Sequence, residues 1–432
     1  MQNGNFLIIL YHIFLAIYSA GIHVASLWNK KAKSWVEGRK YFFKKLKQTY
    51  SNKTQPTVWM HCASLGEFEQ GRPLLKKIKE DFPNAALVIT FFSPSGYDII
   101  KNNKEFDQVY YLPMDSAANA RRLIAMLKPD LVLWIKYEYW YYYLKELKNK
   151  NIPVLLVSGV FRSSQPFFKW YGGFWRKMLD SFEHFFVQND LSKQRLIAIV
   201  HEEKITVSGD TRCDRVINIA SNFIEAPGIA AFCGANKVIV AGSTWEDDEA
   251  GWIHFVREHP AIKFIIAPHE IDHQNIADVK KEFAGSVTYS EWMADQVSGI
   301  RYQVAGERDA RNCMIIDNIG MLSRLYKYAT LTYVGGGFGD DGLHNILEAA
   351  VYGKPVIFGP EYEKNFEAEE LIECSGALSI GSAVELEKVV NILLAHEKEI
   401  LSRGMAAKEY VYKNAGASEK IITYIKSKEY LK

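Results

Sequence analysis

A glutamate stands where a predicted strand gives way to a helix, early in the globular part of the chain. The run TVWMH at residues 57–61 predicts a strand, and the segment ASLGEFEQGRP that follows places Glu67 at the strand-to-helix turn. A carboxylate at such a sheet edge can take a proton from an acceptor hydroxyl. Ser64 and Glu67 also show the S-x-x-E spacing of a helix capping box, which would make Glu67 purely structural. The sequence leaves both interpretations open.

Charged residues also stand at one other strand end of the first half and near the hinge. In LVLWIKYEYW, Lys136 and Glu138 come at a strand end, and strand alternation puts them on the same side, where they can form an ion pair. In SGDTRCDRV, Arg212 lies near the hinge between the two halves, and its planar guanidinium suits a phosphate or a carboxylate. Alternatively, Lys136 joins Arg212 in attracting an anionic ligand. Ordinary surface or hinge ion pairs would explain the same residues without a function.

The second half contains a glycine-rich segment, TYVGGGFGDDGLHNILEAAVYGKPVIFGP. A strand runs into the glycines, and a short helix is predicted to begin near His344 and Asn345. Glycines let a ligand approach the backbone, and the free N–H groups at a helix start favour phosphate. Glu348, one turn later, is placed to accept hydrogen bonds from ribose hydroxyls. The segment therefore predicts a nucleotide site, with glycines that serve only turns as the alternative.

The same segment has a formal dinucleotide motif. Gly337, Gly339 and Gly342 match G-x-G-x-x-G, and Glu361 follows at nearly the usual spacing. The motif lies late in the chain, with too little sequence after it for a dinucleotide-binding fold. A dinucleotide site is therefore the weaker of the two interpretations.

Three further loops end predicted strands of the second half. AGSTWEDDEA carries Ser243 and Thr244 at a predicted helix N-terminus, which favours an anion. IIAPHE carries Pro268 and His269, and IIDNIGMLSRLY carries Gly320 in a strand-to-helix turn. Each alone could be an ordinary cap or loop. Because the carboxyl ends of parallel strands meet at one edge of a sheet, we expect these loops to lie together there.

The elements that position these residues alternate along the chain as strands and helices. This alternation predicts parallel sheets wrapped by helices, in two similar α/β halves joined by a linker around residues 205–237. We expect domains at 51–220 and 221–405, and terminal helices at 406–432 that pack back on the first half. Six short apolar runs predict the strands of each half: TVWMH, ALVITFF, QVYYLP, LVLWI, PVLLVSG and HFFVQ, then KVIVAG, KFIIAP, SVTYS, CMIID, LTYVGGG and PVIFG.

Residues 1–50 predict a membrane anchor followed by a basic amphipathic segment. Residues 5–28 are almost wholly apolar, and a membrane span needs about 20 such residues. Positive charges stay on the cytoplasmic side, which places the body of the protein there. Attachment along the surface of anionic lipid and a buried N-terminal helix are the alternatives. The segment after the apolar residues contains a single acid, Glu37, and eight basic residues. The basic residues are Lys30, Lys31, Lys33, Arg39, Lys40, Lys44, Lys45 and Lys47.

Composition narrows the class of protein. A formal net charge of +2 over 432 residues argues against a nucleic-acid binder, so charge has to be interpreted locally. None of the five cysteines forms a C-x-x-C pair or a Cys/His cluster with zinc-ligand spacing. We expect each cysteine to be a small buried hydrophobe, in a protein without a metal site.

Taken together, these segments resemble one known family, the 3-deoxy-D-manno-octulosonic acid (Kdo) transferases of lipid A assembly. The resemblance covers nearly the whole chain. Besides the N-terminal anchor it rests on GEFEQGRP, EYW, VSGDTR, AGSTWE, APHE, VGGGF and HNILEAA. It implies a GT-B fold of two Rossmann-like domains, with CMP-Kdo as donor, an acylated disaccharide bisphosphate (lipid IVA) as acceptor, and no metal or other cofactor.

The resemblance also assigns roles to residues. Glu67 matches the general base, and Arg212 matches a basic group that stabilises the departing phosphate. The family's E-x-E-L-W pattern has Lys136 in place of its first acid and keeps Glu138, so the role of Lys136 stays open. Other departures from the family's commoner residues are His269, Met321, Leu343 and Ile346. The CMP contacts implied are Pro268, His269, Ile319, Gly320, Met321, Asn345, Ile346, Leu347 and Glu348, to which we add Ser243 and Thr244.

The predicted function is therefore an inverting transfer of Kdo at the cytoplasmic face of the bacterial inner membrane, next to anionic lipid. Two rivals remain at this stage. One is a different GT-B enzyme that uses a UDP-sugar and a lipid-linked acceptor. The other is a non-catalytic membrane tether that binds nucleotide or anionic lipid.

Overall fold

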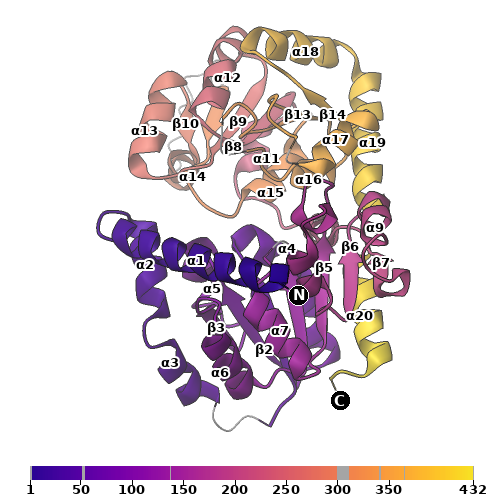
Figure 1. The fold of residues 1–432 in the computed structure, drawn as a ribbon. Helices are drawn as coiled ribbons and strands as arrows, with labels where there is room; N and C mark the ends of the chain where they lie inside the picture. The colour runs from indigo at the N-terminus through magenta and orange to yellow at the C-terminus, as the bar shows by residue number, and fades with distance from the viewer. Residues whose placement is uncertain are drawn as a thin grey trace. The chain divides into compact units, whose positions relative to one another are not determined.

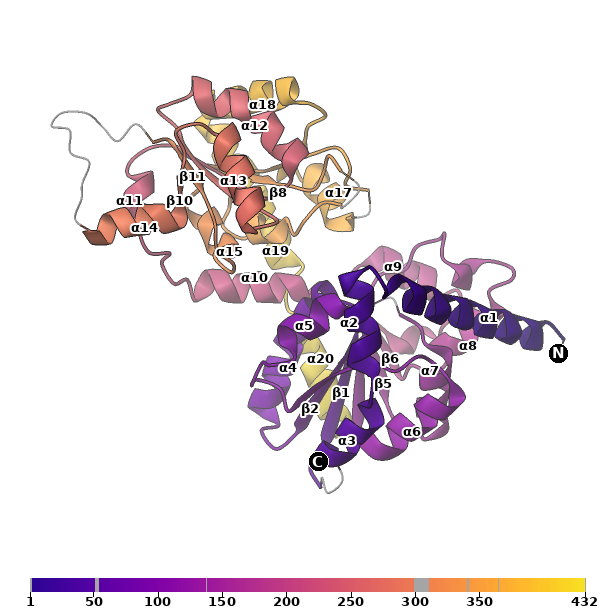
Figure 2. The same cartoon turned by 90° about the vertical axis from the view of Figure 1, so that its left-hand side faces the viewer.

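The chain folds into two α/β units in a computed structural model, which describes residues 2–50, 54–136, 138–298, 311–339, 342–363 and 365–431. Unit 1 comprises Met1–Asp214 and Asn414–Lys432, and unit 2 comprises Arg215–Lys413. The chain therefore passes between the units twice, once within helix α10 (Thr211–Ser221) and once after helix α19 (Glu397–Lys413). Each unit is built around its own parallel sheet (Figures 1 and 2).

The sheet of unit 1 has seven parallel strands in the order β3-β2-β1-β4-β5-β6-β7. The strand order reverses between β1 and β4, which are neighbours in the sheet. In open α/β sheets, ligands bind at such a reversal, beyond the carboxyl ends of the strands. The strands are β1 (Thr57–Cys62), β2 (Ala86–Phe91), β3 (Gln108–Tyr111), β4 (Leu131–Ile135), β5 (Val154–Gly159), β6 (His184–Val187) and β7 (Ile205–Val207).

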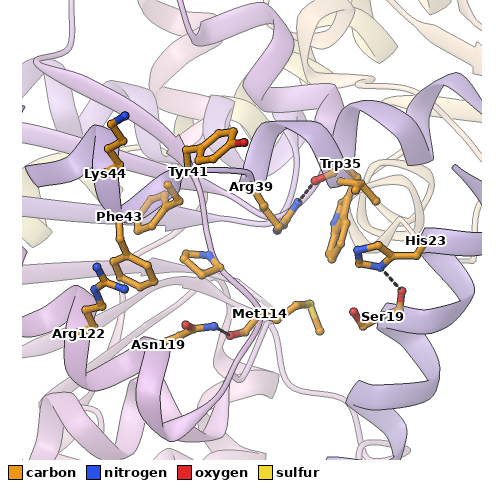
Figure 3. Close-up of a pocket in the computed structure, with 13 residues that line it drawn as sticks. Ser19, His23, Trp35, Arg39, Tyr41, Phe43, Lys44, Met114, Asn119 and Arg122 are labelled. Atoms are coloured by element: carbon orange, nitrogen blue, oxygen red, sulfur yellow. Dashed lines mark hydrogen bonds between the residues drawn. The ribbon is translucent and has the colours of Figure 1, made fainter. Parts of the chain in front are cut away.

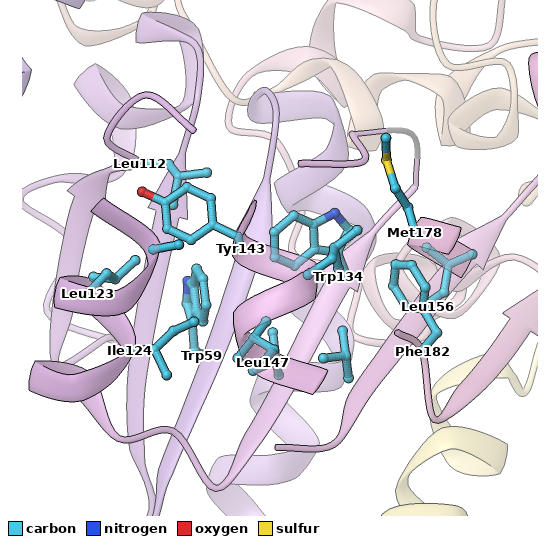
Figure 4. Close-up of a cluster of buried hydrophobic side chains, with 14 of the residues drawn as sticks. Trp59, Leu112, Leu123, Ile124, Trp134, Tyr143, Leu147, Leu156, Met178 and Phe182 are labelled. Atoms are coloured by element: carbon cyan, nitrogen blue, oxygen red, sulfur yellow. The ribbon is translucent and has the colours of Figure 1, made fainter. Parts of the chain in front are cut away.

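Helices cover both faces of this sheet because its strands are apolar on both sides. On one face Trp59, Trp134 and Tyr143 are fully buried among aliphatic side chains (Figure 4). On the other face Val58 and Met60 pack under α4 and the C-terminal helix α20. The helices are α4 (Leu65–Asp81), α5 (Pro94–Ile100), α6 (Ala117–Leu127), α7 (Tyr141–Asn149), α8 (Gly173–Leu179), α9 (Asp190–Leu196) and α20 (Ala417–Lys428), with 3-10 turns η1 (Pro166–Phe168) and η2 (Glu202–Lys204).

Three further helices precede the sheet: α1 (Gln2–Ala25), α2 (Lys30–Arg39) and α3 (Phe42–Tyr50). Phe6–Ala25 is long and apolar enough to cross a membrane, and only 6% of its most apolar window is buried. The alternative of a buried N-terminal helix is therefore wrong. One side of α1 nevertheless lies on unit 1, where the Tyr11 hydroxyl donates to Asp115 Oδ2 at 2.6 Å and the Tyr18 ring lies 5.9 Å from that of Phe92.

The opposite side of α1 presents apolar residues to the surroundings at helical spacing. They are Phe6, Ile9, Leu10, Ile13, Phe14, Ile17 and Val24. The helix thus has one apolar face packed on the protein and a second one left uncovered by it.

The sheet of unit 2 also has seven parallel strands, in the order β10-β11-β9-β8-β12-β13-β14, and its order reverses between β8 and β12. Its strands are β8 (Val238–Thr244), β9 (Lys263–Pro268), β10 (Val287–Thr288), β11 (Cys313–Ile315), β12 (Leu331–Val334), β13 (Val356–Phe358) and β14 (Ala377–Ser379). The helices besides α10 and α19 are α11 (Ile229–Cys233), α12 (Glu246–Glu258), α13 (His273–Glu282), α14 (Tyr289–Ser298), α15 (Leu322–Leu325), α16 (Leu347–Ala350), α17 (Phe366–Glu373) and α18 (Ala383–Ala395), with a 3-10 turn η3 (Tyr326–Tyr328).

The predicted fold class, an α/β protein with two parallel sheets and an apolar N-terminal helix, is confirmed. The sequence prediction missed β7 and β14, each of which has only three residues and lies at the edge of its sheet. Four cysteines are buried as predicted, whereas Cys374 is exposed because it follows the end of α17.

Candidate active site

Glu67 lies on the first turn of α4, directly beyond the carboxyl end of β1. Its carboxylate accepts a hydrogen bond from the backbone N–H of Ala63, and the residue is only 9% exposed. Ser64 is the N-cap of α4, but its hydroxyl accepts no hydrogen bond from the helix. The reciprocal contacts of a capping box are therefore not what holds Glu67. A negative group is favoured at a helix N-terminus, so the position suits an ionised carboxylate.

Glu138 follows β4, the strand beside β1, and it is held by two side chains. Its Oε2 atom lies 2.9 Å from His61 Nε2 and accepts a hydrogen bond from Trp140 Nε1 at 3.0 Å. His61 is fully buried, and its Nδ1 lies 2.9 Å from the Thr90 hydroxyl. The Glu138 side chain keeps 20% of its surface exposed. A buried histidine thus fixes a partly exposed carboxylate at the point where the strand order reverses.

Lys136 and Arg212 share an acidic neighbour that the sequence interpretation overlooked. Arg212 donates from Nη2 and Nε to Asp210 Oδ2 at 2.6 and 2.9 Å. Asp210 is buried, which disfavours its charge, but Arg212 and then Lys136 outweigh this and lower the pKa of Asp210. Lys136 has a left-handed backbone at φ 56°, which is uncommon outside glycine. The structure therefore brings the charge of Lys136 toward Asp210, while a Lys136–Glu138 pair stays a prediction.

In unit 2, Ser243 and Thr244 end β8 at the strand-order reversal. Ser243 has a left-handed backbone at φ 53°. The buried Thr244 hydroxyl donates to Glu249 Oε1 at 2.7 Å. Thr244 thus already has a partner on α12, and a direct contact of either residue with a nucleotide stays a prediction.

Asp248, on the first turn of α12, links the loops that follow β8 and β12. Its Oδ2 accepts the backbone N–H groups of Trp245 at 3.0 Å and Gly336 at 2.9 Å, and its Oδ1 accepts the Tyr333 hydroxyl at 2.5 Å. A Cβ on Gly335 would lie 2.6 Å from Asp248 Oδ2, so the turn requires glycine there. Two of the glycine-segment residues therefore build the turn itself.

His269 follows Pro268 at the end of β9 and lies in a stack of three rings. Its ring centroid is 4.6 Å from that of Trp245 and 4.4 Å from that of His344. Trp245 Nε1 donates to His344 Nε2 at 3.1 Å, and the His269 backbone N–H donates to Thr244 at 2.9 Å. The structure thus brings the loops after β8, β9 and β12 together at one edge, as the sequence predicts.

The loop after β11 contributes an exposed turn. Ile319 is 87% exposed and Gly320 has φ 91°, whereas Met321 is buried at the start of α15. Any contact of Met321 with a ligand would therefore use its backbone. The same holds for Ile346 and Leu347, whose side chains are buried.

Glu348 is oriented by two neighbours. Its Oε1 atom lies 3.0 Å from Arg215 Nη1 and 3.3 Å from Asn345 Nδ2. Asn345 Oδ1 in turn accepts the backbone N–H of Leu347 at 3.3 Å. Arg215 is a second site residue that the sequence interpretation overlooked, although it lies three residues after Arg212 on the same helix.

Known proteins match this chain in sequence. A family model described as 3-Deoxy-D-manno-octulosonic-acid transferase (kdotransferase) matches residues 37–215. A 3-deoxy-D-manno-octulosonic acid transferase of Chlamydia trachomatis serovar A is 28% identical over 354 residues, 79% of this chain and 79% of that protein. The chain is similar to the Kdo transferases over 79% of its length. The matched residues contain Glu67, Lys136, Glu138 and Arg212, the four predicted catalytic residues of this glycosyltransferase.

Two further matches concern length and fold. A bifunctional glycosyltransferase/methyltransferase of Fusobacterium nucleatum is 26% identical over 361 residues, which are 81% of this transferase but 54% of that protein, so the chain spans about half its length. The UDP-GlcNAc 2-epimerase of Neisseria meningitidis, solved with UDP-GlcNAc, superposes with a TM-score of 0.60 at 17% identity, over 86% of this chain and 100% of that chain. At that identity the likeness concerns the fold alone, and it agrees with the predicted GT-B architecture.

The weaker interpretation of the glycines, a dinucleotide motif, lacks its structural context in this transferase. Such a motif needs a helix that opens within it, but residues 342–346 precede α16 without forming a helix. Glu361 donates its backbone N–H to Gly337 at 2.8 Å and so belongs to the turn. In the described part of the chain, no three His, Cys, Asp or Glu side chains gather as a metal site would require.

Proposed function

We propose that this transferase moves Kdo from CMP-Kdo to a primary hydroxyl of an acylated glucosamine disaccharide, with inversion at the anomeric carbon. The observation that carries the proposal is the position of Glu67. Its carboxylate is held by the Ala63 N–H at the strand-order reversal of unit 1, outside a capping box. It is thus held at the sheet edge where ligands of this fold bind, and the Ser64 hydroxyl makes no cap hydrogen bond to the helix.

The chemistry needs one base and groups that offset negative charge. Glu67 takes the proton of the acceptor hydroxyl while its oxygen bonds to the anomeric carbon. The bond from that carbon to the phosphate oxygen breaks, and CMP leaves with the electron pair. Arg212 is a cation of the same unit that suits the leaving phosphate and the Kdo carboxylate. Asp210 fixes the Arg212 guanidinium through two hydrogen bonds.

Unit 2 is proposed to hold CMP. The support is the cluster of loops at the carboxyl edge around β8 and β12, together with the resemblance of their motifs. Glu348, oriented by Arg215 and Asn345, suits ribose hydroxyls. The exposed turn at Ile319 and Gly320 leaves backbone groups open to a base.

Membrane attachment is proposed to bring the enzyme to its acylated acceptor. The uncovered apolar face of α1 and the basic residues of α2 and α3 suit an anionic cytoplasmic leaflet. Because the other face of α1 lies along unit 1 from Tyr11 to Tyr18, the structure favours attachment along the membrane surface over a span.

The test is mass spectrometry of lipid IVA after incubation with the full-length chain in detergent and CMP-Kdo. We expect addition of Kdo, which requires CMP-Kdo and is not supported by UDP-sugars. The Glu67→Gln variant serves as the enzyme control. Transfer from a UDP-sugar instead would assign a different GT-B reaction, and tight CMP binding without any transfer would favour the tether.

A further inference from the structure

A cavity of about 440 Å³ lies among the N-terminal helices and the loop after β3 (Figure 3). His23 of α1 borders it on one side, Arg39 of α2 lies between, and Lys44 of α3 and Arg122 of α6 lie on the other. None of the described residues that line it is acidic. Two arginines and a lysine therefore line one pocket beside the apolar helix.

Arg39 is the half-buried cation of this pocket. It donates to the carbonyl oxygens of Leu112 at 2.8 Å, Trp35 at 3.1 Å and Phe92 at 2.7 Å. Its guanidinium carbon lies 3.7 Å from the Trp35 ring centroid. Burial lowers the pKa of Arg39 to about 9, so it is still protonated at neutral pH. The direct partners of Arg39 are carbonyl oxygens and aromatic rings rather than a carboxylate, so the positive charge of the pocket favours an anion.

The other two cations are exposed and can reach a ligand. Arg122 lies with its guanidinium carbon 4.3 Å from the Phe43 ring centroid, and Lys44 is exposed on the first turn of α3. Arginine and lysine in such a setting form charge-assisted hydrogen bonds to phosphate oxygens. Three cations around a pocket with aromatic walls thus suit a phosphate group on a larger, partly apolar molecule.

Two features beside the pocket point to a glycolipid as the molecule that carries the phosphate. They are the apolar face of α1 and the carboxylate of Glu138. The uncovered apolar face of α1 runs toward the pocket, since Ile17 and Val24 are exposed and Ser19 and His23 line it. The pocket residue Arg39 also lies near the aromatic side chains that connect to Glu138.

The connection to Glu138 consists of two aromatic rings. The Arg39 guanidinium carbon is 5.0 Å from the Phe92 ring centroid, which is 4.8 Å from that of Trp140, and Trp140 donates to Glu138. The Glu138 carboxylate also acts electrostatically on Arg39. A lipid face, a phosphate pocket and the proposed catalytic edge are therefore contiguous on unit 1.

We propose that this pocket binds a phosphate of the acylated disaccharide acceptor, through Arg39, Lys44 and Arg122, while acyl chains lie along α1. The proposal rests on the proposed function, because it takes the acceptor to be a phosphorylated glycolipid. It adds the site by which unit 1 distinguishes that acceptor from other lipids.

The test is equilibrium binding to the full-length chain in neutral detergent micelles, by thermophoresis, without donor. The probes are lipid IVA and the same acylated disaccharide with its phosphates removed. We expect Arg122→Ala and Lys44→Ala each to weaken lipid IVA binding about tenfold, as the loss of one charge-assisted contact predicts. Binding of the dephosphorylated probe is expected to stay unchanged. Arg121→Ala and Lys45→Ala are matched controls, since both side chains are exposed next to the pocket residues but do not line the pocket.

Several outcomes would overturn the proposal. One is that Arg122→Ala binds lipid IVA as tightly as Arg121→Ala does. Another is that the pocket variants bind both probes more weakly, to the same extent. The third is that the wild type does not bind lipid IVA. If Arg122→Ala and Lys44→Ala bind lipid IVA as the wild type does but no longer bind phosphatidylglycerol vesicles, the pocket binds bulk phospholipid instead. Because no donor is present, a protein that binds lipid IVA as expected but transfers no Kdo would refute the proposed function and leave this site standing.

Discussion

His61 Nε2 lies 2.9 Å from Glu138 Oε2, which joins the ends of the two strands where the sheet order of unit 1 reverses. Trp59 Nε1 donates to the Thr90 hydroxyl at 2.9 Å, and that hydroxyl lies 2.9 Å from His61 Nδ1. A hydrogen on His61 Nε2 lets every donor in this row find an acceptor. Buried residues of β1 and β2 thus fix the orientation of the Glu138 carboxylate.

The first prediction compares Glu138 with Lys136. Glu138→Gln keeps the size of the side chain but removes the charge that His61 and Trp140 orient, so we expect a large loss of kcat. Lys136→Met is expected to cost modest activity. It removes the predicted ion pair with Glu138, and an exposed or partly exposed ion pair contributes only about 0–1 kcal/mol of stability. Steady-state kinetics of both variants measure this. A larger loss for Lys136→Met, expressed as a raised KM for CMP-Kdo, would instead show direct contact of Lys136 with the donor.

The second prediction concerns the proposed base. Glu67→Gln keeps the shape and a hydrogen-bond acceptor for the Ala63 N–H but cannot take a proton. Loss of a general base lowers the rate by about 10²- to 10⁴-fold, and CMP affinity should hardly change. Glu80→Gln, at an exposed position of the same helix, is the matched control. Near-normal turnover of Glu67→Gln would make Glu67 structural.

The sequence predicted where Glu67 and Glu138 lie relative to the strands of unit 1, because strand ends follow directly from the hydrophobic pattern, while their catalytic roles stay predictions. Glu67 comes five residues after the end of β1 and Glu138 three residues after the end of β4, and parallel pairing brings such ends to one edge. The partners were missed for a physical reason. His61 is an interior residue of an apolar strand, and nothing local shows that its ring reaches Glu138. Asp210 was a visible signal, since it lies two residues before Arg212.

In unit 2 the sequence predicted the loops but not which side chains turn inward. Ile346, Leu347 and Met321 are buried, which periodicity cannot show in helices of four residues. Whether Thr244 faces a ligand or Glu249 depends on tertiary packing of α12. The sequence therefore indicates which segments gather at this edge of the sheet, while the contacts of the individual residues remain predictions.

The third prediction concerns CMP. A ligand that binds only the native state stabilises it by about 2.7 kcal/mol at a concentration 100 times its Kd, so CMP should raise the melting temperature. Glu348→Ala should reduce that rise, because it removes the carboxylate oriented by Arg215. Glu361→Ala should not, and NAD should give no rise. Protection by NAD that Glu361→Ala abolishes would restore the dinucleotide interpretation.

The fourth prediction concerns the membrane face of α1. Ile17 is 68% exposed, so Ile17→Glu should leave the melting temperature unchanged. A charged side chain costs up to about 3 kcal/mol in the centre of a bilayer and less near its surface, so vesicle binding should fall about tenfold. Ile392→Glu adds the same charge on α18, at a residue 44% exposed, and should bind vesicles normally. Equal cosedimentation of the two variants would show that α1 does not contact lipid.

The last prediction concerns pH and His184, a buried residue of β6 whose Nε2 lies 2.8 Å from the Thr206 hydroxyl. Burial, aided by Lys428 and Lys204, lowers the pKa of His184 to about 4 from the usual 6.5. Between those two values the unfolded chain takes up a proton that the folded chain does not, so the stability of the wild type falls as pH drops from 6.5 to 4.

His184→Gln keeps a polar partner for Thr206 but does not titrate. We expect the free energy of unfolding of the wild type, relative to this variant, to fall by on the order of 2 kcal/mol across that range. Burial raises the pKa of Asp115 to about 6, but Asp115 titrates in both proteins and cancels in the comparison. Urea unfolding at pH 7 and pH 4 measures the difference, and a constant offset between the two proteins would show that His184 does not resist protonation in the folded state.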